Sequence, residues 1–293
     1  MKKSAVAKRE ARWGVLFLSP SLILLIVFSL LPIAASIVLS FTDYNVLSSP
    51  EWNGIENYLR MLKDPYVRDS LKNTLIYTVI TVPLQTAISL ALAAVIAEFF
   101  RNRFGNFVKS ALFVPVIASA ALVGVVWSML LLSRGPVNEL LDFFGIEAVN
   151  WLTGSLRPLL VVSFVNVWKD VGYFMVIFYA GIMNIPRNLY EAAQVDGAGP
   201  MQCFWHITLP NLKGITYLVV TLGTIWTFQT FDLVQVMTGG GPGTATTTLV
   251  LTIYRAAFKE YRMGYASAIA VLLLVFILLL SFLQKRLMKG GEE

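Results

Sequence analysis

The chain has 293 residues, of which 57% are hydrophobic and 14% are charged; its net charge is +6 and its mean hydropathy is +0.70. Because a water-soluble domain carries roughly 25% charged residues, this composition indicates a protein whose main solvent is hydrocarbon. Cys203 is the one cysteine and His206 the one histidine. This excludes an intrachain disulfide and a cysteine metal cluster, and removes most histidine metal sites and catalytic triads.

A helix that crosses a bilayer needs about 20 predominantly apolar residues. Six stretches of the sequence meet this requirement, and we expect an all-α membrane protein with six transmembrane helices in one domain over residues 1–293. The expected spans are 13–41, 71–98, 107–132, 158–183, 215–237 and 264–283.

The first expected span follows a basic region that resembles the start of a signal peptide. Its cations are Lys2, Lys3, Lys8, Arg9 and Arg12. The apolar segment is much longer than the roughly 7–15 residues of a cleaved signal, so we expect a retained anchor.

The second and third expected spans are rich in small residues, which in lipid allow the close backbone approach that drives helix association. We therefore expect these helices to lie in a tight bundle. The small residues are Ala87, Ser89, Ala91, Ala93, Ala94 and Ala97 in the second span and Ala118, Ser119, Ala120, Ala121 and Gly124 in the third.

The fourth and fifth expected spans contain ionisable residues, namely Lys169, Asp170 and Asp232. Such residues usually face protein or water, because each costs on the order of 2.5–3.5 kcal/mol at the bilayer centre. Gln229 lies three residues before Asp232, so a continuous helix would place both on one face. Lys169 and Asp170 are adjacent and would point in different directions, which favours an interhelical clamp.

Asn166, Trp168 and Tyr173 add amide and aromatic groups to the fourth span. Amides, carboxylates and rings suit a sugar, whose hydroxyls need hydrogen-bond partners and whose C–H faces stack on aromatics. Gln229 and Asp232 therefore fit a substrate path and a structural polar clamp equally well.

Between these two spans lies a loop, 184–213, with the composition of two short helices. Pro186 suits a first helical turn, residues 188–195 favour a helix, and Pro200 can start the second one. Gly197 permits a turn that residues with a Cβ resist. We expect a helix–turn–helix at the cytoplasmic face.

The distribution of Lys and Arg predicts the orientation of the chain. With the N-terminus inside, the inner segments hold more cations than the outer loops, although the outer loops are longer in total. We expect both termini in the cytoplasm, and we attribute the positive net charge to topology rather than to nucleic-acid binding.

The loop carries a specific pattern: Glu191-Ala192-Ala193, three residues, Gly197, nine residues, then Ile207-Thr208-Leu209-Pro210. In spacing and identity it resembles the EAA signature of ABC importer permeases. Further segments resemble the carbohydrate-uptake, MalF-like branch of these binding-protein-dependent systems. They are Gly54, Asn57-Tyr58, Asp64-Pro65, Asn73-Thr74, Met237 to Pro242, Tyr254 to Phe258 and Gly264 to Ala266.

The resemblance implies a permease subunit in a bacterial or archaeal cell membrane, without an enzymatic activity, a metal or a cofactor of its own. Its implied partners are a second permease, two ATPase subunits and an extracytoplasmic sugar-binding protein, and its implied substrate is a sugar, most simply an oligosaccharide. Glu191, Ala192, Ala193 and Gly197 would form the helix that couples the chain to an ATPase. The maltose-system namesake carries extra N-terminal spans and a large outer domain, whereas we expect this chain to be the shorter six-span version common in related sugar systems.

The glycine-rich segment 239–243 lacks the Lys-Ser/Thr ending of a phosphate-binding loop. We therefore expect this segment to form a flexible outer turn and ATP to be hydrolysed by a partner.

Two other functions compete with the permease. An ion-coupled secondary transporter could use Asp170 and Asp232 as proton carriers, but such proteins often contain an inverted repeat, and none is visible in this sequence. A membrane enzyme or assembly factor is disfavoured, because the sequence has no histidine or cysteine cluster and no paired carboxylates at helical spacing within a span.

Overall fold

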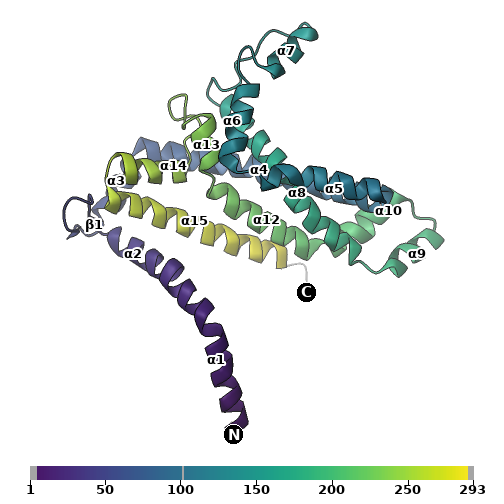
Figure 1. The fold of residues 1–293 in the computed structure, drawn as a ribbon, viewed down its shortest axis with the longest axis horizontal. Helices are drawn as coiled ribbons and strands as arrows, with labels where there is room; N and C mark the ends of the chain where they lie inside the picture. The colour runs from purple at the N-terminus through teal and green to yellow at the C-terminus, as the bar shows by residue number, and fades with distance from the viewer. Residues whose placement is uncertain (1–4, 101, 290–293) are drawn as a thin grey trace. The chain divides into compact units, whose positions relative to one another are not determined.

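The structure is a computed structural model that describes residues 5–100 and 102–289, and it is built almost entirely of helices (Figure 1). Lys2 and Lys3 of the basic N-terminal region lie outside the described residues. The chain divides into two units. One comprises residues up to Lys63 together with Ile253–Leu272, and the other comprises Asp64–Thr252 together with the residues from Leu273 onward.

The first unit begins with one long helix, made of α1 (Ala5–Leu25), the π-helical turn η1 (Ile26–Leu30) and α2 (Leu31–Leu39). Its segment Trp13–Leu39 is long and apolar enough to cross a membrane, and no side chain in that segment is buried. This agrees with the expectation of an N-terminal span, which ends at Leu39 rather than at Phe41.

A small cap follows this helix, formed by β1 (Thr42–Asp43), β2 (Glu51–Trp52) and α3 (Glu56–Lys63). The strands pair antiparallel. The buried Asn57 donates hydrogen bonds to the carbonyls of Ser40 and Thr42, at 3.0 and 2.9 Å. The last helix, α15 (Met263–Lys289), starts against the same turn, since a Cβ on Gly264 would overlap the Thr42 carbonyl oxygen.

The second unit is organised around α4 (Pro65–Phe99) and α8 (Arg157–Met183), which pack along each other. Asp64 caps α4 by accepting a hydrogen bond from the Tyr66 amide at 2.9 Å, and Pro65 occupies the first turn, where its missing N–H costs nothing. Of the small residues expected to pack in this span, Ser89, Ala93 and Ala97 are fully buried. The tight packing predicted for this helix is thus confirmed at these positions.

The third expected span, 107–132, is not a straight helix. The chain forms α5 (Arg103–Ile117) and α6 (Ala120–Leu130), whose axes differ by 97°. Pro115 removes a backbone donor near the end of α5, and Ala118 adopts an extended conformation. The Ser119 hydroxyl then caps α6 by accepting from the Leu122 amide at 3.3 Å. The apolar run was visible in the sequence. That Ser119, in the middle of this run, caps a second helix was not predicted.

The fifth expected span, 215–237, is broken as well. It forms α12 (Lys213–Phe228) and α13 (Asp232–Met237), separated by three non-helical residues. The expectation that Gln229 and Asp232 share a face of one helix is therefore wrong. The Thr230 carbonyl at the break accepts a hydrogen bond from the Thr248 hydroxyl at 3.2 Å. Contacts with α6 then hold α13: a Cβ on Gly124 would lie 3.1 Å from the Val236 side chain.

By length and composition, four of the described helices can cross a membrane, and the bent pair α5–α6 raises the number to five. The four segments are Trp13–Leu39, Pro65–Phe99, Arg157–Met183 and Met263–Arg286. The fifth expected span, 215–237, does not reach this length because its apolar residues are divided between α12 and α13, and α12 has only 16 residues.

Two loops of the second unit contain further helices. The loop between α6 and α8 contains α7 (Pro136–Phe143). The loop between α8 and α12 contains α9 (Arg187–Val195), α10 (Pro200–Cys203), η2 (Phe204–Thr208) and α11 (Leu209–Asn211). After α13, the chain returns through α14 (Leu249–Tyr254) and η3 (Arg255–Lys259) to α15.

The glycine-rich loop after α13, expected to be a flexible turn, is hydrogen-bonded to the N-terminal part of α4. Asn73 donates from its side-chain amide to the carbonyls of Thr244 and Thr247, at 2.6 and 3.1 Å. The Thr74 hydroxyl accepts from the Leu249 amide at 3.0 Å and so caps α14. The Asn73-Thr74 pair thereby fixes the return of the chain from the broken fifth span.

The crossing of α5 and α8 gives a direct test of this packing. A Cβ on Gly172 would overlap the Leu112 carbonyl oxygen, whereas a Cβ on Gly214, also in a helix, would meet nothing within 4 Å. We expect Gly172→Ala to push α5 away from α8 and to lower the thermal unfolding midpoint of the purified protein in detergent. Gly214→Ala should leave the midpoint unchanged or raise it slightly, because alanine favours a helix. Equal midpoints for the two variants would contradict the close approach.

Candidate functional site

The loop 184–213 folds as expected into short helices joined at a glycine. α9 ends with hydrogen bonds from the Gly197 amide to the Gln194 carbonyl and from the Ala198 amide to the Ala193 carbonyl, at 3.0 and 2.8 Å. Gly197 has a φ of +82°, a conformation that residues with a Cβ avoid. The predicted conformational role of this glycine in the turn is confirmed.

The second half of the loop packs back against α9. The Tyr190 and Thr208 hydroxyls are hydrogen-bonded at 2.9 Å and join α9 to η2, and the Gly199 amide donates to the Gln202 side chain at 2.8 Å. Glu191 and Ala192 are exposed on the outside of this structure, and Ala193 is half-buried. Val195, at the end of α9, is 88% exposed. The loop thus presents a short, well-supported helix with an accessible acidic and apolar surface.

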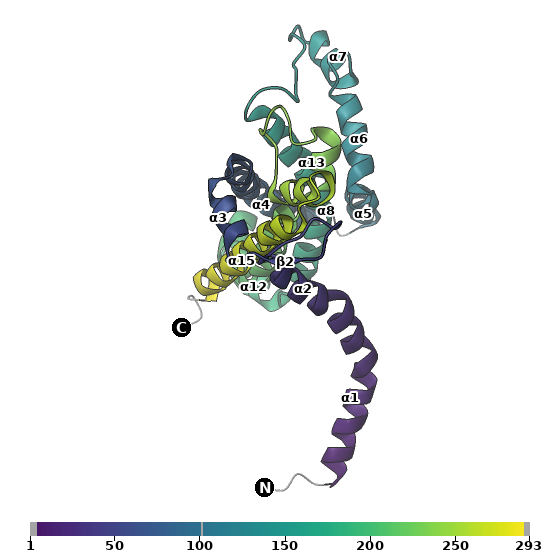
Figure 2. The same cartoon turned by 90° about the vertical axis from the view of Figure 1, so that its left-hand side faces the viewer.

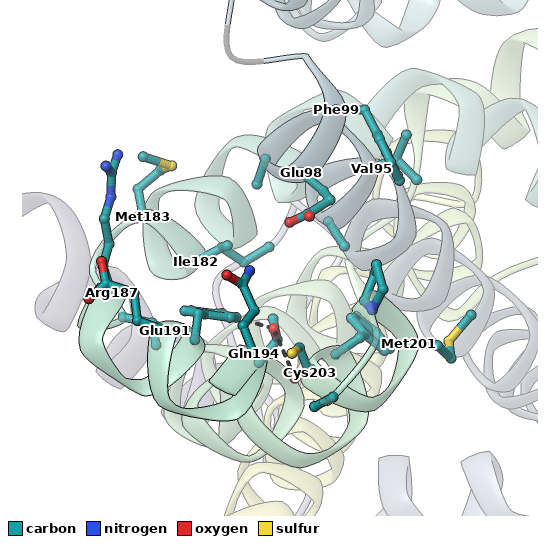
Figure 3. Close-up of a pocket in the computed structure, with 18 of the residues that line it drawn as sticks. Val95, Glu98, Phe99, Ile182, Met183, Arg187, Glu191, Gln194, Met201 and Cys203 are labelled. Atoms are coloured by element: carbon teal, nitrogen blue, oxygen red, sulfur yellow. Dashed lines mark hydrogen bonds between the residues drawn. The ribbon is translucent and has the colours of Figure 1, made fainter. Parts of the chain in front are cut away.

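A cavity of about 730 Å³ lies between this loop and the C-terminal end of α4 (Figure 3). Glu98 points into it from α4, and Gln194 points into it from α9 (Figure 3). Small side chains of α4, including Ala91 and Ala94, form one wall, and Cys203 lies on the opposite side. The cavity thus brings a carboxylate of the spanning helix and an amide of the loop helix to one open space.

A polar chain crosses from α4 to α8 among buried residues. The Tyr77 hydroxyl donates to the Asn166 side-chain oxygen at 2.7 Å, and the Asn166 amide donates to Asp170 at 3.0 Å. Lys169 pairs with the other oxygen of Asp170 at 2.9 Å. The expectation that Lys169 and Asp170 point in different directions is wrong, because the flexible lysine side chain bends back to its neighbour.

The candidate residues of the fourth span differ in their exposure and in their contacts. Asn166 is 8% exposed and its amide is used within the protein, which fits the clamp reading of this residue. Trp168 is 41% exposed and packs edge-on against Trp127 of α6, with ring centres 5.5 Å apart. Tyr173 lies against Trp226 of α12, at 4.9 Å between ring centres.

Two accessible polar side chains lie at the break in the fifth span. Gln229 ends α12, Asp232 begins α13, and both are exposed, as is Trp226 one turn before the break. Interrupted helices in transporters commonly lie at solute sites, because the unwound backbone there lines a cavity. Sequence reasoning missed Trp226 and Tyr77. Trp226 could have been found from the sequence, because it lies three residues before Gln229 and therefore on the same helical face. Tyr77 could not, because its contact with Asn166 of another helix depends on the fold.

Long apolar helices, breaks in two expected spans and an exposed loop helix are typical of the membrane subunits of transporters. The chain belongs to the family described as the binding-protein-dependent transport system inner membrane component, which matches residues 74–290. It is thus a translocation component of a multi-pass membrane transporter and not itself an enzyme.

Characterised relatives match nearly the whole chain. The chain is 34% identical over 282 residues to the probable ABC transporter permease protein YurN of Bacillus subtilis, covering 95% of this chain and 96% of YurN. It is 32% identical over 282 residues to the trehalose/maltose transport system permease protein MalF of Thermococcus litoralis, covering 95% and 94% of the two chains.

Solved structures show the same fold. A bacterial ABC transporter for import of the acidic polysaccharide alginate contains a chain with a TM-score of 0.85 and 24% identity, covering 98% of this chain and 99% of that chain. A second structure, of a bacterial alginate ABC transporter in complex with an alginate pentasaccharide-bound periplasmic protein, matches with a TM-score of 0.80 and 25% identity, covering 96% of each chain.

The ion pair in α8 allows a test of the polar chain. Replacing Asp170 by Leu leaves the Lys169 ammonium and the Asn166 amide without their partner, which for a buried pair costs about 3–5 kcal/mol. We expect Asp170→Leu to lower the thermal unfolding midpoint strongly and the double variant Lys169→Leu/Asp170→Leu to recover much of the loss. A double variant no more stable than Asp170→Leu would contradict a mutual pairing.

Proposed function

We propose that the chain is one of two permease subunits of an ABC importer that brings a sugar, most simply an oligosaccharide, into the cell. The observation that carries this proposal is the match over nearly the whole chain to sugar-system permeases, such as the trehalose/maltose protein of Thermococcus litoralis. In this proposal ATP is hydrolysed by two partner ATPases, and an extracytoplasmic binding protein delivers the sugar. The alginate importer seen with its periplasmic protein supports that arrangement.

The proposed topology has six crossings with both termini in the cytoplasm. Six crossings result when α5 with α6 and α12 with α13 each count as one span that bends before it leaves the membrane. The loop 184–213 then lies on the cytoplasmic side. The excess of Lys and Arg in the segments assigned to that side supports the same orientation.

In this arrangement α9 is the helix that an ATPase subunit contacts. Glu191 offers an exposed carboxylate to a cation of the partner, and Ala192 and Ala193 allow a close approach. Gly197 sets the bend that returns the chain through α10 to α12. The hydrogen bond between Tyr190 and Thr208 makes the loop one body, so that a force on α9 reaches the fifth span.

The sugar path is proposed to run past the break between α12 and α13. Gln229 and Asp232 supply exposed hydrogen-bonding groups there. The exposed faces of Trp226, Tyr173 and Trp168 supply surfaces on which sugar rings can stack. Asn166 contributes by orienting α4 against α8 rather than by contacting the sugar. The ion-coupled alternative is less suited to Asp170, which is already paired with Lys169.

Reconstitution tests the coupling role. In liposomes containing the complete complex, Glu191→Arg should reduce ATP-driven sugar uptake, either by weakening ATPase association or by letting hydrolysis proceed without transport. Glu51→Arg makes the same charge change at an exposed residue of the outer cap and serves as the control. Normal uptake by the Glu191→Arg complex would contradict the coupling role.

The substrate class has a separate test. A carbohydrate screen against the cognate binding protein, followed by measurement of binding-protein-stimulated ATP hydrolysis by the complex, should identify a sugar. We expect Trp226→Ala to reduce uptake of that sugar while the complex stays assembled, because a stacking interaction worth about 1 kcal/mol or more of binding free energy is lost.

The same uptake measurement tests the ion-coupled alternative. Uptake that persists without ATP and collapses with the proton gradient would favour an ion-coupled transporter instead.

A further inference from the structure

The non-helical residues 229–231 between α12 and α13 lie among other helices of their unit. α13 lies beside α6 in both views and also contacts α8, while a side chain of α4 reaches the break itself (Figures 1 and 2). A broken helix in a membrane depends on neighbouring groups for the hydrogen bonds that it lacks. The shape of this break is therefore set by residues outside α12 and α13.

Tyr77 of α4 links the break to α8. Its side chain is fully buried, and its hydroxyl donates to the Asn166 side-chain oxygen at 2.7 Å. The Thr230 side chain, in the middle of the break, is hydrogen-bonded to the same hydroxyl. The Thr230 hydroxyl also donates to the Trp226 carbonyl in the last turn of α12, at 3.2 Å. One phenol thereby connects α4, α8 and the end of α12.

Thr74, one turn before Tyr77 on the same face of α4, supports the break from the other direction. Its hydroxyl accepts from the Leu249 amide at 3.0 Å and so fixes the start of α14. Thr248, the residue before Leu249, donates to the Thr230 carbonyl at 3.2 Å. The backbone and the side chain of Thr230 are therefore both held by contacts that depend on one face of α4.

A simple clamp between α4 and α8 is the alternative role of Tyr77. This helix pair has independent support about three turns further along α4, where the Ser89 hydroxyl donates to the Val171 carbonyl at 3.0 Å and Ala93 is fully buried. Loss of the Tyr77 hydroxyl leaves these contacts intact. A clamp between two helices also requires no contact with Thr230, whereas a support of the break does.

The groups proposed for the sugar path lie on both sides of this break. Trp226 lies one turn before Thr230, Gln229 directly follows α12, and Asp232 is the first residue of α13. The side chains of Trp226, Gln229 and Asp232 are exposed. A sugar that stacks on a ring and bonds to polar groups needs a fixed separation between them. The geometry of the break determines that separation.

We propose that Tyr77 is a positioning residue of the sugar path. Through its contact with Thr230 it fixes the angle at which α13 leaves α12, and this angle places Asp232 relative to Trp226. The Tyr77 side chain is buried and does not contact the sugar. This inference rests on the proposed function, because the sugar path is part of that proposal.

Removal of the hydroxyl tests this role in liposomes that contain the complete complex, with the sugar identified by the screen of its binding protein. The measured quantity is sugar taken up per ATP hydrolysed, because a merely unstable complex loses uptake and hydrolysis together. We expect Tyr77→Phe to lower this ratio about two- to tenfold, the range for the loss of one hydrogen bond. Tyr58→Phe is the matched control, since it removes a tyrosine hydroxyl that is bonded to Ser40 at the same distance, 2.7 Å, and it should keep the wild-type ratio.

A double-mutant cycle tests whether Tyr77 acts through the break. Thr230→Val keeps the shape of the side chain and removes its hydroxyl, so it should lower the ratio as Tyr77→Phe does. Because both changes remove the same contact, the double variant should lose no more than the stronger single variant. Fold losses that multiply in the double variant would show that the two residues act separately and would overturn the proposal.

The remaining outcomes separate this inference from the proposed function. A wild-type complex that takes up no sugar with ATP would contradict the proposed function itself. If the wild-type complex transports and Tyr77→Phe keeps its ratio, only the positioning role fails. A Tyr77→Phe complex that cannot be purified at the wild-type yield would show that the hydroxyl is needed for assembly, and this result too would overturn the positioning role.

Discussion

The contact between α4 and α8 is the constraint on which the second unit depends. The two helices approach closely where the Ser89 hydroxyl donates to the Val171 carbonyl at 3.0 Å, and the next residue, Gly172, admits the backbone of α5 on another side of α8. The hydrophobic effect does not drive association between helices in lipid. Small residues at these crossings stabilise the packing instead, because they allow the backbones to approach closely. With α8 held on both sides, its polar residues have fixed neighbours, and the breaks in the third and fifth spans can occur without loss of the bundle.

The two broken spans complement each other. α6 begins at a serine cap after a bend, α13 begins after three non-helical residues, and the two short helices pack together with Gly124 facing Val236. The Thr230 carbonyl, freed by the second break, accepts from Thr248 in the ordered loop that Asn73 and Thr74 attach to α4. This backbone group is thus satisfied within the protein, as hydrocarbon requires. The accessible Gln229 and Asp232 are left at the position where the proposed sugar path passes.

Two peripheral loops of this unit differ in the way they are supported. The helix α9 is joined to η2 by the hydrogen bond between Tyr190 and Thr208, and a cavity lies between this loop and α4. The loop that contains α7 is held by the buried side chain of Asn138, which hydrogen-bonds to both of its arms. In the proposed function, α9 is the element that meets an ATPase subunit.

The sequence by itself determined the membrane class, the approximate positions of four spans, the helix–turn–helix with Gly197 at its bend, and the family, because apolar length, glycine conformation and the Glu191–Pro210 spacing are local properties. Tertiary structure decided where the apolar runs bend. It also decided that Asn166 is held by Tyr77 and Asp170, and that Gln229 and Asp232 lie on either side of a break. The physical reason is that a helix in lipid breaks only where groups outside that helix supply hydrogen-bond partners, as the Thr248 hydroxyl does for the Thr230 carbonyl, and the apolar pattern does not show which groups these are.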